Sequence, residues 1–119
     1  MTTALARLAR PAFWAAILLL ALLSLLPKEQ MARTGAAGWL EHFGAYAGTM
    51  LLGAVGYARR IGLARPALVL IAYAAVLELL QYFSPGRSPG LLDFAAGAAG
   101  VVATAWIFHF MMAREREPQ

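Results

Sequence analysis

The amino-acid sequence predicts an all-α, polytopic membrane protein: a four-helix transmembrane bundle with both termini in the cytoplasm. Three observations predict it, namely the composition, a series of long apolar runs, and the placement of basic residues between those runs. Of 119 residues, 61% are hydrophobic and only 13% are charged, against roughly 45–50% and 25% in an average soluble domain. A soluble domain of about this length buries only some two-thirds of its surface, so it could not hide this much apolar material from water. The bilayer is the expected solvent.

The charge balance excludes a nucleic-acid-binding domain. Ten basic and six acidic residues give a net charge of +4, but the arginines stand in small groups between apolar runs rather than in one basic patch. The absence of cysteine from the sequence rules out disulfides, thiolate nucleophiles and cysteine metal sites. We therefore expect membrane components as partners and no nucleic acid.

Four apolar runs are each close to the length that crosses a hydrocarbon core, which takes about 20 residues of helix. The expected helices cover residues about 5–26, 39–58, 66–83 and 91–113. The strands of a barrel would be shorter and would alternate in polarity, and these runs do neither. The sequence thus predicts a single transmembrane domain over residues 1–119.

The basic residues predict the orientation, because cytoplasmic loops are enriched in Lys and Arg. With four spans, the termini and the middle loop share one side, which has seven basic residues: Arg7, Arg10, Arg59, Arg60, Arg65, Arg114 and Arg116. The opposite side has three: Lys28, Arg33 and Arg87. Both termini are therefore expected in the cytoplasm. An alternative interpretation makes the first run a secretory signal peptide, but no convincing cleavage site follows Leu26 closely.

Small residues on two of the runs predict how the helices pack, since helices in a bilayer associate through close contact at Gly, Ala, Ser and Thr. In the second run these residues are Gly44, Gly48, Thr49, Gly53 and Gly56, the first two forming a small-xxx-small pair. In the fourth run the residues of one helical face are Asp93, Gly97, Gly100 and Thr104. We expect both stripes at helix–helix contacts, with the second stripe directing Asp93 into the bundle.

The candidate site lies at the outer end of the third and fourth runs. Glu78 and Gln81 share one helical face, and the repeated Ser-Pro-Gly of residues 84–90 predicts a short, stiff turn that makes these helices antiparallel neighbours. Arg87 lies in the turn and Asp93 just beyond it. A carboxylate inside a membrane costs several kcal/mol unless it is paired or protonated, so such residues are functional candidates.

Two interpretations of this group stay open. In the first, Arg87 pairs with Glu78 or Asp93, or binds an anionic headgroup from outside. In the second, a polar clasp closes the hairpin and consists of Glu78, Gln81, Arg87 and Asp93. His42 and Tyr46 of the second run lie one turn apart at the same outer level. The ligand-binding candidates are therefore Arg87, Glu78, Gln81, Asp93, His42 and Tyr46, and the catalytic candidates are Glu78, Asp93 and His42. We assign no metal to them, and the cofactor is unknown.

The spacing of these residues resembles a known family. The pattern is Glu78-x-x-Gln81, then Phe83-Ser84-Pro85-Gly86-Arg87, then Asp93 followed by Gly97 and Gly100, with His42-Phe43 and Tyr46 upstream. It is similar to the VanZ-like family of bacterial membrane proteins, over about residues 42–103. The resemblance implies a small multi-pass protein of the cytoplasmic (inner) membrane, in a family named for a member linked to low-level teicoplanin resistance.

The chain departs from the family pattern at two places. An Asp-Lys pair commonly precedes the histidine, where this sequence has Gly38 and Trp39, and an asparagine commonly follows the aspartate, where it has Gly97. Both departures remove polar groups from the inferred site.

The sequence supports several functions of different classes. The first is that the outer site binds or modifies an anionic lipid or a lipid-linked cell-wall precursor. The second is a membrane enzyme that uses carboxylate and histidine acid–base or metal chemistry. The third is a non-catalytic structural partner protein. Transport is a fourth, which would require several copies to line a path, and the sequence leaves a homo-oligomer open.

Overall fold

The computed structural model describes residues 3–31 and 34–115, and its elements are all helical. The α-helices are α1 (Thr3–Leu25), α2 (Gly38–Ile61), α3 (Ala64–Leu80) and α4 (Leu91–Arg114). Two short 3-10 helices, η1 (Lys28–Gln30) and η2 (Gln81–Phe83), lie in the connections. The all-α prediction and its four helices are confirmed. Arg33 and Arg116, which entered the orientation argument, lie outside the described residues.

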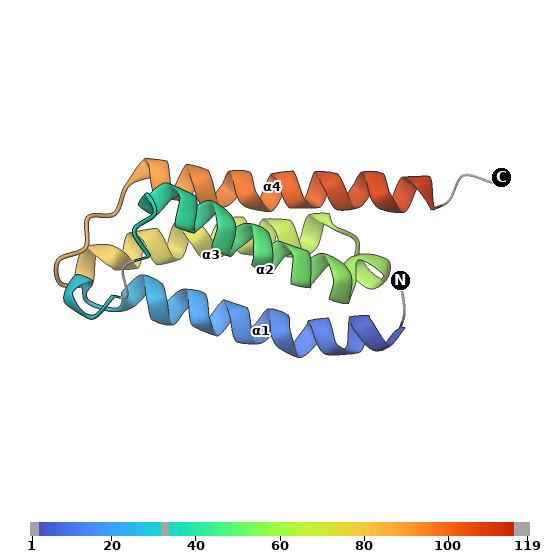
Figure 1. Cartoon of the computed structure of the whole chain (residues 1–119), viewed down its shortest axis with the longest axis horizontal. Coiled ribbons are helices and arrows are strands. Elements are labelled where there is room, and N and C mark those ends of the chain that lie inside the picture. Colours follow the sequence, from blue (N-terminus) through green and yellow to red (C-terminus); the bar gives the residue numbers. More distant parts are fainter. Residues whose placement is uncertain (1–2, 32–33, 116–119) are drawn as a thin grey trace.

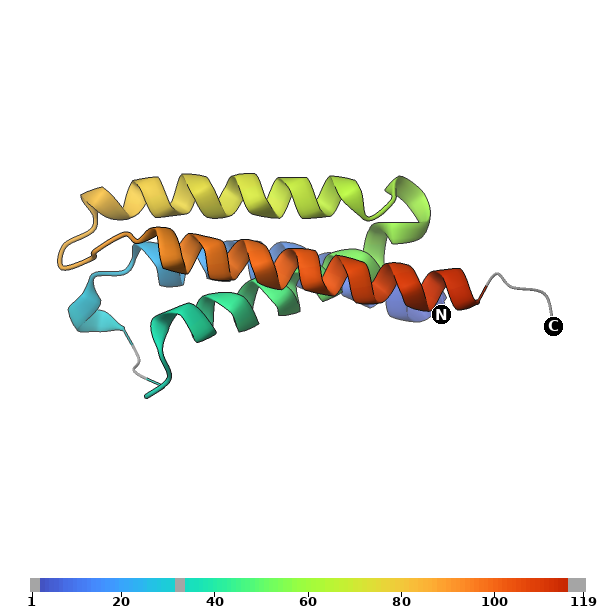
Figure 2. The ribbon, with the colours of Figure 1, turned by 90° about the horizontal axis from the view of Figure 1, so that it is seen from above.

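The α-helices run side by side in a narrow bundle of 55 × 25 × 25 Å (Figures 1 and 2). The start of α1, the α2–α3 turn and the end of α4 lie at one end, called here the termini end. The α1–α2 and α3–α4 connections lie at the other end, called here the cleft end. A helix of 23 or 24 residues, such as α1, α2 or α4, is about 35 Å long, which matches a hydrocarbon core of about 30 Å.

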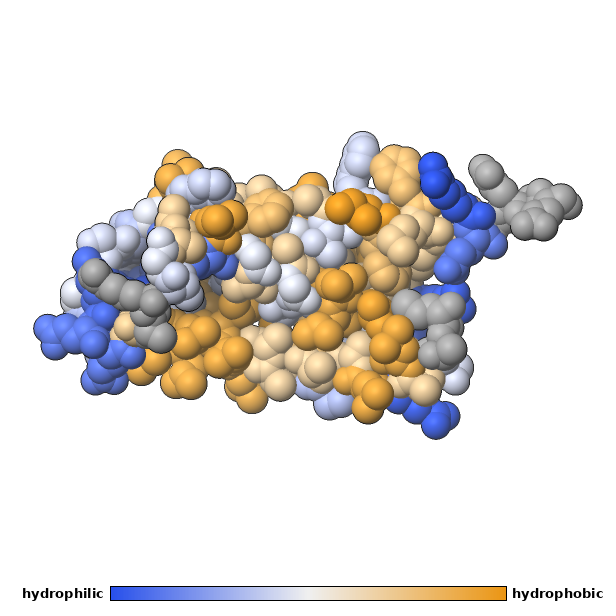
Figure 3. Space-filling model, in the orientation of Figure 1, coloured by the Kyte–Doolittle hydropathy of each residue, from blue (hydrophilic) through white to orange (hydrophobic). Residues whose placement is uncertain are grey.

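Among the described residues, three helices are long and apolar enough to cross a membrane: α1, α3 together with η2 (Ala64–Phe83), and α4. Much of their apolar surface is exposed, including Leu8, Leu18 and Leu68, each at least 67% exposed. Figure 3 shows the consequence, an apolar band between two more hydrophilic ends. Such an exposed apolar surface is compatible with contact with lipid.

Helix α2 is as long as α4 but is less apolar, because five glycines, Glu41 and His42 lie within it. It occupies the centre of the bundle, where it contacts α1, α3 and α4. Its buried residues are Tyr46, Thr49, Met50, Gly53, Ala54, Gly56 and Ala58. They form the core with residues such as Leu70 of α3 and Val101 of α4, both fully buried.

The predicted small-residue face of α4 packs against α2. A Cβ atom added at Gly97 would lie 2.9 Å from the ring of Tyr46, and one at Gly100 would collide with the backbone oxygen of Phe43. The Thr104 hydroxyl donates to the carbonyl oxygen of Ala47 at 3.4 Å. These contacts confirm the prediction that this face of α4 is a helix–helix contact.

The prediction for α2 is right for one half of its stripe and wrong for the other. Gly53 and Gly56 pack against α1, where added Cβ atoms would lie 2.9 Å from Phe13 and 3.1 Å from Arg10. An added Cβ at Gly44 or Gly48 would meet nothing within 4 Å. The small-xxx-small pair therefore faces away from the bundle, because the bulky core residues of α2 project from the opposite side of the helix.

Candidate functional site

The α3–α4 connection forms the predicted tight turn. Its Arg87 N–H donates to the carbonyl oxygen of Ser84 at 3.2 Å. Pro85 and Gly86 occupy the two central positions, and Gly86 has a φ of +72°. Proline followed by glycine with positive φ is the type II turn preference. The turn places the side chains of Ser84 and Arg87 over the end of α1.

Arg87 binds the end of α1. Its Nε donates to the carbonyl oxygen of Leu26 at 3.0 Å, and its Nη2 donates to that of Leu23. A cation at this position also complements the negative end of the helix dipole. Burial lowers the pKa of Arg87, and the charges of Glu78 and Asp93 act in the opposite direction. The guanidinium remains protonated at neutral pH.

In the structure, Arg87 forms no direct ion pair with Glu78 or Asp93. Within residues 3–31 and 34–115, the ion pair found is Arg59–Glu115 at the termini end. Arg87 instead uses its hydrogen bonds on α1, because Pro27 has no N–H and so leaves the Leu23 carbonyl without its usual partner in the helix. The two carboxylates act on Arg87 through charge alone.

Two further side chains of the same connection cap α1. Gln81 Nε2 donates to the carbonyl oxygen of Ser24 at 3.1 Å, and Ser84 Oγ donates to that of Leu25 at 2.7 Å. With Arg87, they satisfy the carbonyls of residues 23–26, which the end of a helix leaves unpaired. The buried amide of Gln81, 5% exposed, therefore has a structural partner. This set of contacts fits the clasp interpretation.

Glu78 caps the start of α4. Its Oε1 accepts a hydrogen bond of 2.5 Å from the N–H of Gly90, the residue that precedes the first turn of α4. A carboxylate there complements the positive end of the helix dipole. Glu78 therefore joins α3 to α4 and lines neither of the two cavities described next.

An open cleft of about 580 Å³ lies at the cleft end, between the two connections and the start of α2. Its charged and larger polar lining residues are Lys28, Glu41, His42, Gln81, Arg87 and Asp93. The lining of this cleft thus includes four of the six ligand-binding candidates, His42, Gln81, Arg87 and Asp93, but not Glu78 or Tyr46. Lys28 and Glu41 were not predicted, because each stands directly at the end of an apolar run and resembles an ordinary flanking charge.

A second cavity, of about 280 Å³, adjoins the cleft. The residues that line both are Met31, Thr34, Glu41, His42, Gln81 and Arg87. The second cavity continues along α1 and α2, where it is lined by Leu20, Leu23, Ala45 and Tyr46. Tyr46 is 3% exposed and packs on Gly97, so it forms a wall. A charged opening therefore leads into an apolar groove.

His42 is held in one tautomer when neutral. Its Nδ1 lies 2.9 Å from the carbonyl oxygen of Gly38, and because a carbonyl only accepts, Nδ1 must carry the proton. Nε2 is then the acceptor of the neutral ring. The carboxylate of Asp93 lies against the same glycine, with its oxygens 3.7 and 3.8 Å from an added Cβ. A base and a carboxylate thus flank Gly38.

The other cleft carboxylate is tied to the neighbouring loop, since Glu41 accepts a hydrogen bond from the Thr34 hydroxyl. In the part of the chain that the structure describes, no group of three or more His, Asp or Glu side chains is arranged to hold a metal ion. The side chains that line the cleft can donate and accept hydrogen bonds and pair with charges.

This geometry defines a small helical protein of membrane character with one mixed-charge cleft open to an apolar groove. Comparisons of the chain with protein-family models, with curated proteins and with solved structures gave no match.

Proposed function

We propose that this chain is a four-span, VanZ-like protein of the bacterial cytoplasmic membrane whose cleft binds an amphiphile, either an anionic lipid or a lipid-linked cell-wall precursor. The observation that carries the proposal is the junction of the charged cleft with the apolar groove, which share six lining residues. A lipid has the same two parts, a charged head and an apolar chain, in the same order. Sites with an apolar wall and a few fixed polar groups are typical of small-ligand binding.

The central place of α2 supports four spans. Its lower apolarity matters less than it would in an isolated helix, because seven of its residues are buried by the other helices. Four spans put the cleft on the outer face and the termini end in the cytoplasm, in keeping with the six arginines on the described part of that end: Arg7, Arg10, Arg59, Arg60, Arg65 and Arg114.

The mixed charge of the cleft favours a particular head. Lys28 and Arg87 supply cations for a phosphate, and a guanidinium retains further N–H donors after its two bonds to α1. Glu41 and Asp93 accept hydrogen bonds, so they favour hydroxyl or amine groups beside the phosphate. We propose a headgroup that combines a phosphate with several donors, as in a polyprenyl-diphosphate-linked amino sugar or phosphatidylglycerol.

The test is binding of these two lipids to the purified full chain in a neutral detergent, followed by native mass spectrometry. Lys28→Ala and Asp93→Asn are each expected to weaken binding by roughly tenfold or more, the range for a lost hydrogen bond to a charged group. Glu29→Ala, a change next to Lys28 but outside the cleft lining, should leave binding unchanged. Wild-type binding by both cleft variants would sink the proposal.

A second candidate is a membrane enzyme, and the tautomer of His42 favours it. An acceptor Nε2 on a residue that lines the cleft is suited to removing a proton from a bound hydroxyl or water. His42→Gln should then abolish turnover of the bound lipid while leaving its binding within about twofold of wild type. Loss of binding without any detectable turnover by the wild-type protein would leave His42 a binding residue and remove the enzyme from consideration.

A further inference from the structure

A second charged pocket lies at the termini end, opposite the cleft. It has a volume of about 360 Å³ and lies between the first turns of α1 and the last turns of α2. Four of its lining residues are arginines, two from each helix: Arg7, Arg10, Arg59 and Arg60. None of the lining residues within the described ranges is acidic. This concentration of guanidinium groups in one hollow has no role in the cleft.

The close approach of α1 and α2 builds the pocket. The helices touch at Gly56, where an added Cβ would lie 3.1 Å from the Cγ of Arg10. Arg10 Nε donates to the carbonyl oxygen of Gly56 at 2.9 Å, and its guanidinium lies 5.7 Å from the ring centre of Tyr57. Arg10 is therefore fixed at the helix contact, with its remaining N–H groups available.

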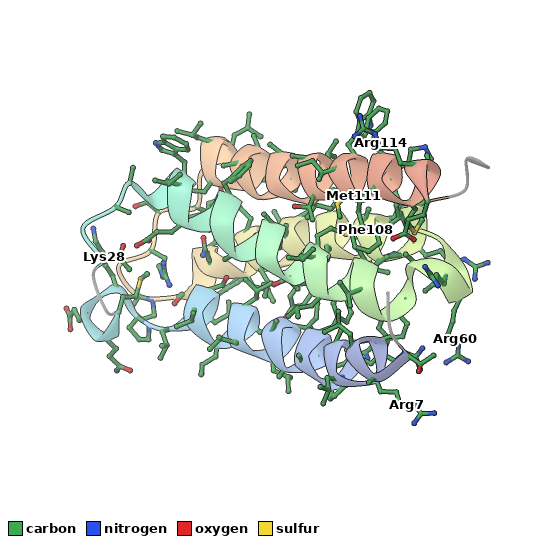
Figure 4. The ribbon with its side chains drawn as sticks, turned by 45° about the vertical axis from the view of Figure 1, so that its right-hand side comes forward. Arg7, Lys28, Arg60, Phe108, Met111 and Arg114 are labelled. Carbon is green, nitrogen blue, oxygen red and sulfur yellow. The ribbon has the colours of Figure 1, made fainter. Side chains whose placement is uncertain are left out.

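The other arginines stand around this fixed cation. Arg7 is one turn before Arg10 on α1, and Arg59 and Arg60 are one turn beyond Gly56 on α2. Figure 4 shows the labelled side chains of Arg7 and Arg60 extending from neighbouring helices at the same end of the bundle. The pocket thus has one held guanidinium, that of Arg10, and three exposed ones, of which Arg59 also pairs with Glu115.

The positive charge of the pocket is only partly balanced. Among the described residues, Arg59 pairs with Glu115 at 3.1 Å, but the two side chains are 58% and 56% exposed, so water and salt screen the pair. Arg7 and Arg60 make no side-chain hydrogen bond or ion pair with the described part of the chain. Like charges gathered around one pocket repel one another, and an anion bound between them reduces that repulsion.

We propose that this pocket binds the phosphate of an anionic phospholipid headgroup. A lipid is favoured over a soluble phosphate because the face of α1 that carries Arg7 and Arg10 continues further along the helix with the exposed Trp14 and Leu18. A bound lipid can lay an acyl chain along Trp14 and Leu18 while its phosphate meets the arginines, whose planar donors match phosphate oxygens. Basic pockets between helices at a membrane surface bind lipid headgroups in this way. The site is separate from the cleft and does not depend on its ligand.

The experiment compares phosphatidylglycerol with phosphatidylcholine as probes on the full chain in neutral detergent, read by native mass spectrometry. The test variant is the double change Arg7→Gln and Arg60→Gln, which spares the helix contact made by Arg10. The control is Arg65→Gln with Arg114→Gln, which removes the same charge from the same end but from outside the pocket lining. Circular dichroism verifies that both variants keep their helices.

Wild type is expected to prefer phosphatidylglycerol by roughly tenfold or more, since each basic residue near an anionic lipid contributes several-fold to affinity. The pocket variant should lose most of this preference, and the control should keep it. Both variants are compared in the Lys28→Ala background, so that binding at the cleft does not mask the loss. Equal losses in the two variants would overturn the pocket in favour of diffuse charge attraction. Displacement of the lipid by an equal concentration of inorganic phosphate would overturn the choice of a lipid, and the absence of any preference would overturn the proposal as a whole.

Discussion

At the scale of single residues, the arginine that is most conspicuous in the sequence has a structural task as well as a place in the cleft. Arg87 donates to two carbonyls at the end of α1 while it lines both cavities. Pro27 creates the need for one of these bonds because it has no N–H to offer Leu23. A variant at Arg87 therefore changes stability and binding together, which is why the cleft is better tested at Lys28 and Asp93.

Removal of the Arg87 side chain is expected to destabilise the protein. Arg87→Ala leaves two carbonyls without donors and removes a cation from a helix C-terminus, for a loss of about 1–3 kcal/mol in the free energy of unfolding. Unfolding in mixed micelles, followed by circular dichroism, measures it. Ser88→Ala, in the same turn and exposed, is the control and should be neutral. Equal stability of Arg87→Ala and wild type would contradict the capping role.

At the scale of the elements, α2 organises the bundle because its two faces differ. One face of α2 receives Gly97 and Gly100 of α4 and places its own Gly53 against α1, and a Cβ atom added at any of these three glycines would lie too close to the facing helix. The other face, with Gly44 and Gly48, touches nothing within the described chain at the distance of a Cβ contact. Glycine is therefore needed where the helices touch, whereas Gly44 and Gly48 leave room for a larger side chain.

A pair of glycine substitutions separates these faces. Gly100→Ala places a methyl group against the backbone of Phe43 and forces α4 away from α2, with an expected loss of about 1–3 kcal/mol or more. Gly48→Ala adds a methyl group in open space and removes a flexible residue from a helix, so stability should hold or rise by up to about 1 kcal/mol. Thermal unfolding of both variants in one detergent measures the difference. Similar losses in both would refute the assignment of the two faces.

How far sequence predicts these elements depends on the kind of information involved. Helix positions follow from the lengths of apolar runs, and the bounds agree within three residues at every end. The turn at 84–87 follows from proline and glycine chemistry. The packing face of α2 does not follow, because the small-xxx-small pattern of Gly44 and Gly48 gives a close-approach surface without saying whether a partner helix covers it.

The candidate site, too, could be predicted from the sequence only in part. The sequence placed His42, Gln81, Arg87 and Asp93 at one level, and the fold brings them to one cleft. It did not assign Glu78 to the start of α4 or Arg87 to the end of α1, because backbone groups at helix ends are invisible in a pattern of side chains. Lys28 and Glu41 were not predicted, because a charged residue next to an apolar run is expected at a membrane boundary in any case.

At the scale of the whole molecule, the two ends differ in charge and in the kind of cavity they hold. The cleft end has a mixed-charge cleft, and the termini end has a pocket of four arginines. The proposed four spans put these ends on opposite faces of the membrane. The number of spans decides this arrangement, since three spans would put the start of α1 and the end of α4 on opposite sides.

Cysteine labelling tests the arrangement directly, because the chain has no native cysteine. A membrane-impermeant maleimide applied to intact spheroplasts should label Ser88→Cys in the α3–α4 connection. Thr3→Cys and Glu115→Cys should react only after permeabilisation, and the fully buried position of Ala54→Cys should stay unreactive as the control. Labelling of Thr3→Cys and Glu115→Cys from opposite sides would rule out four spans.

The capped end of α1 has a consequence for the order in which the chain folds during synthesis. A ribosome finishes α1 first, yet the side chains that satisfy its last carbonyls come 57 to 64 residues later. Until then those carbonyls need water, because lipid offers no donors, and the end of the nascent helix must stay at the aqueous boundary. The α3–α4 hairpin, which is synthesised after α1, thus locks the end of α1, and a chain cut short after α2 would hold an α1 whose end is still open to solvent.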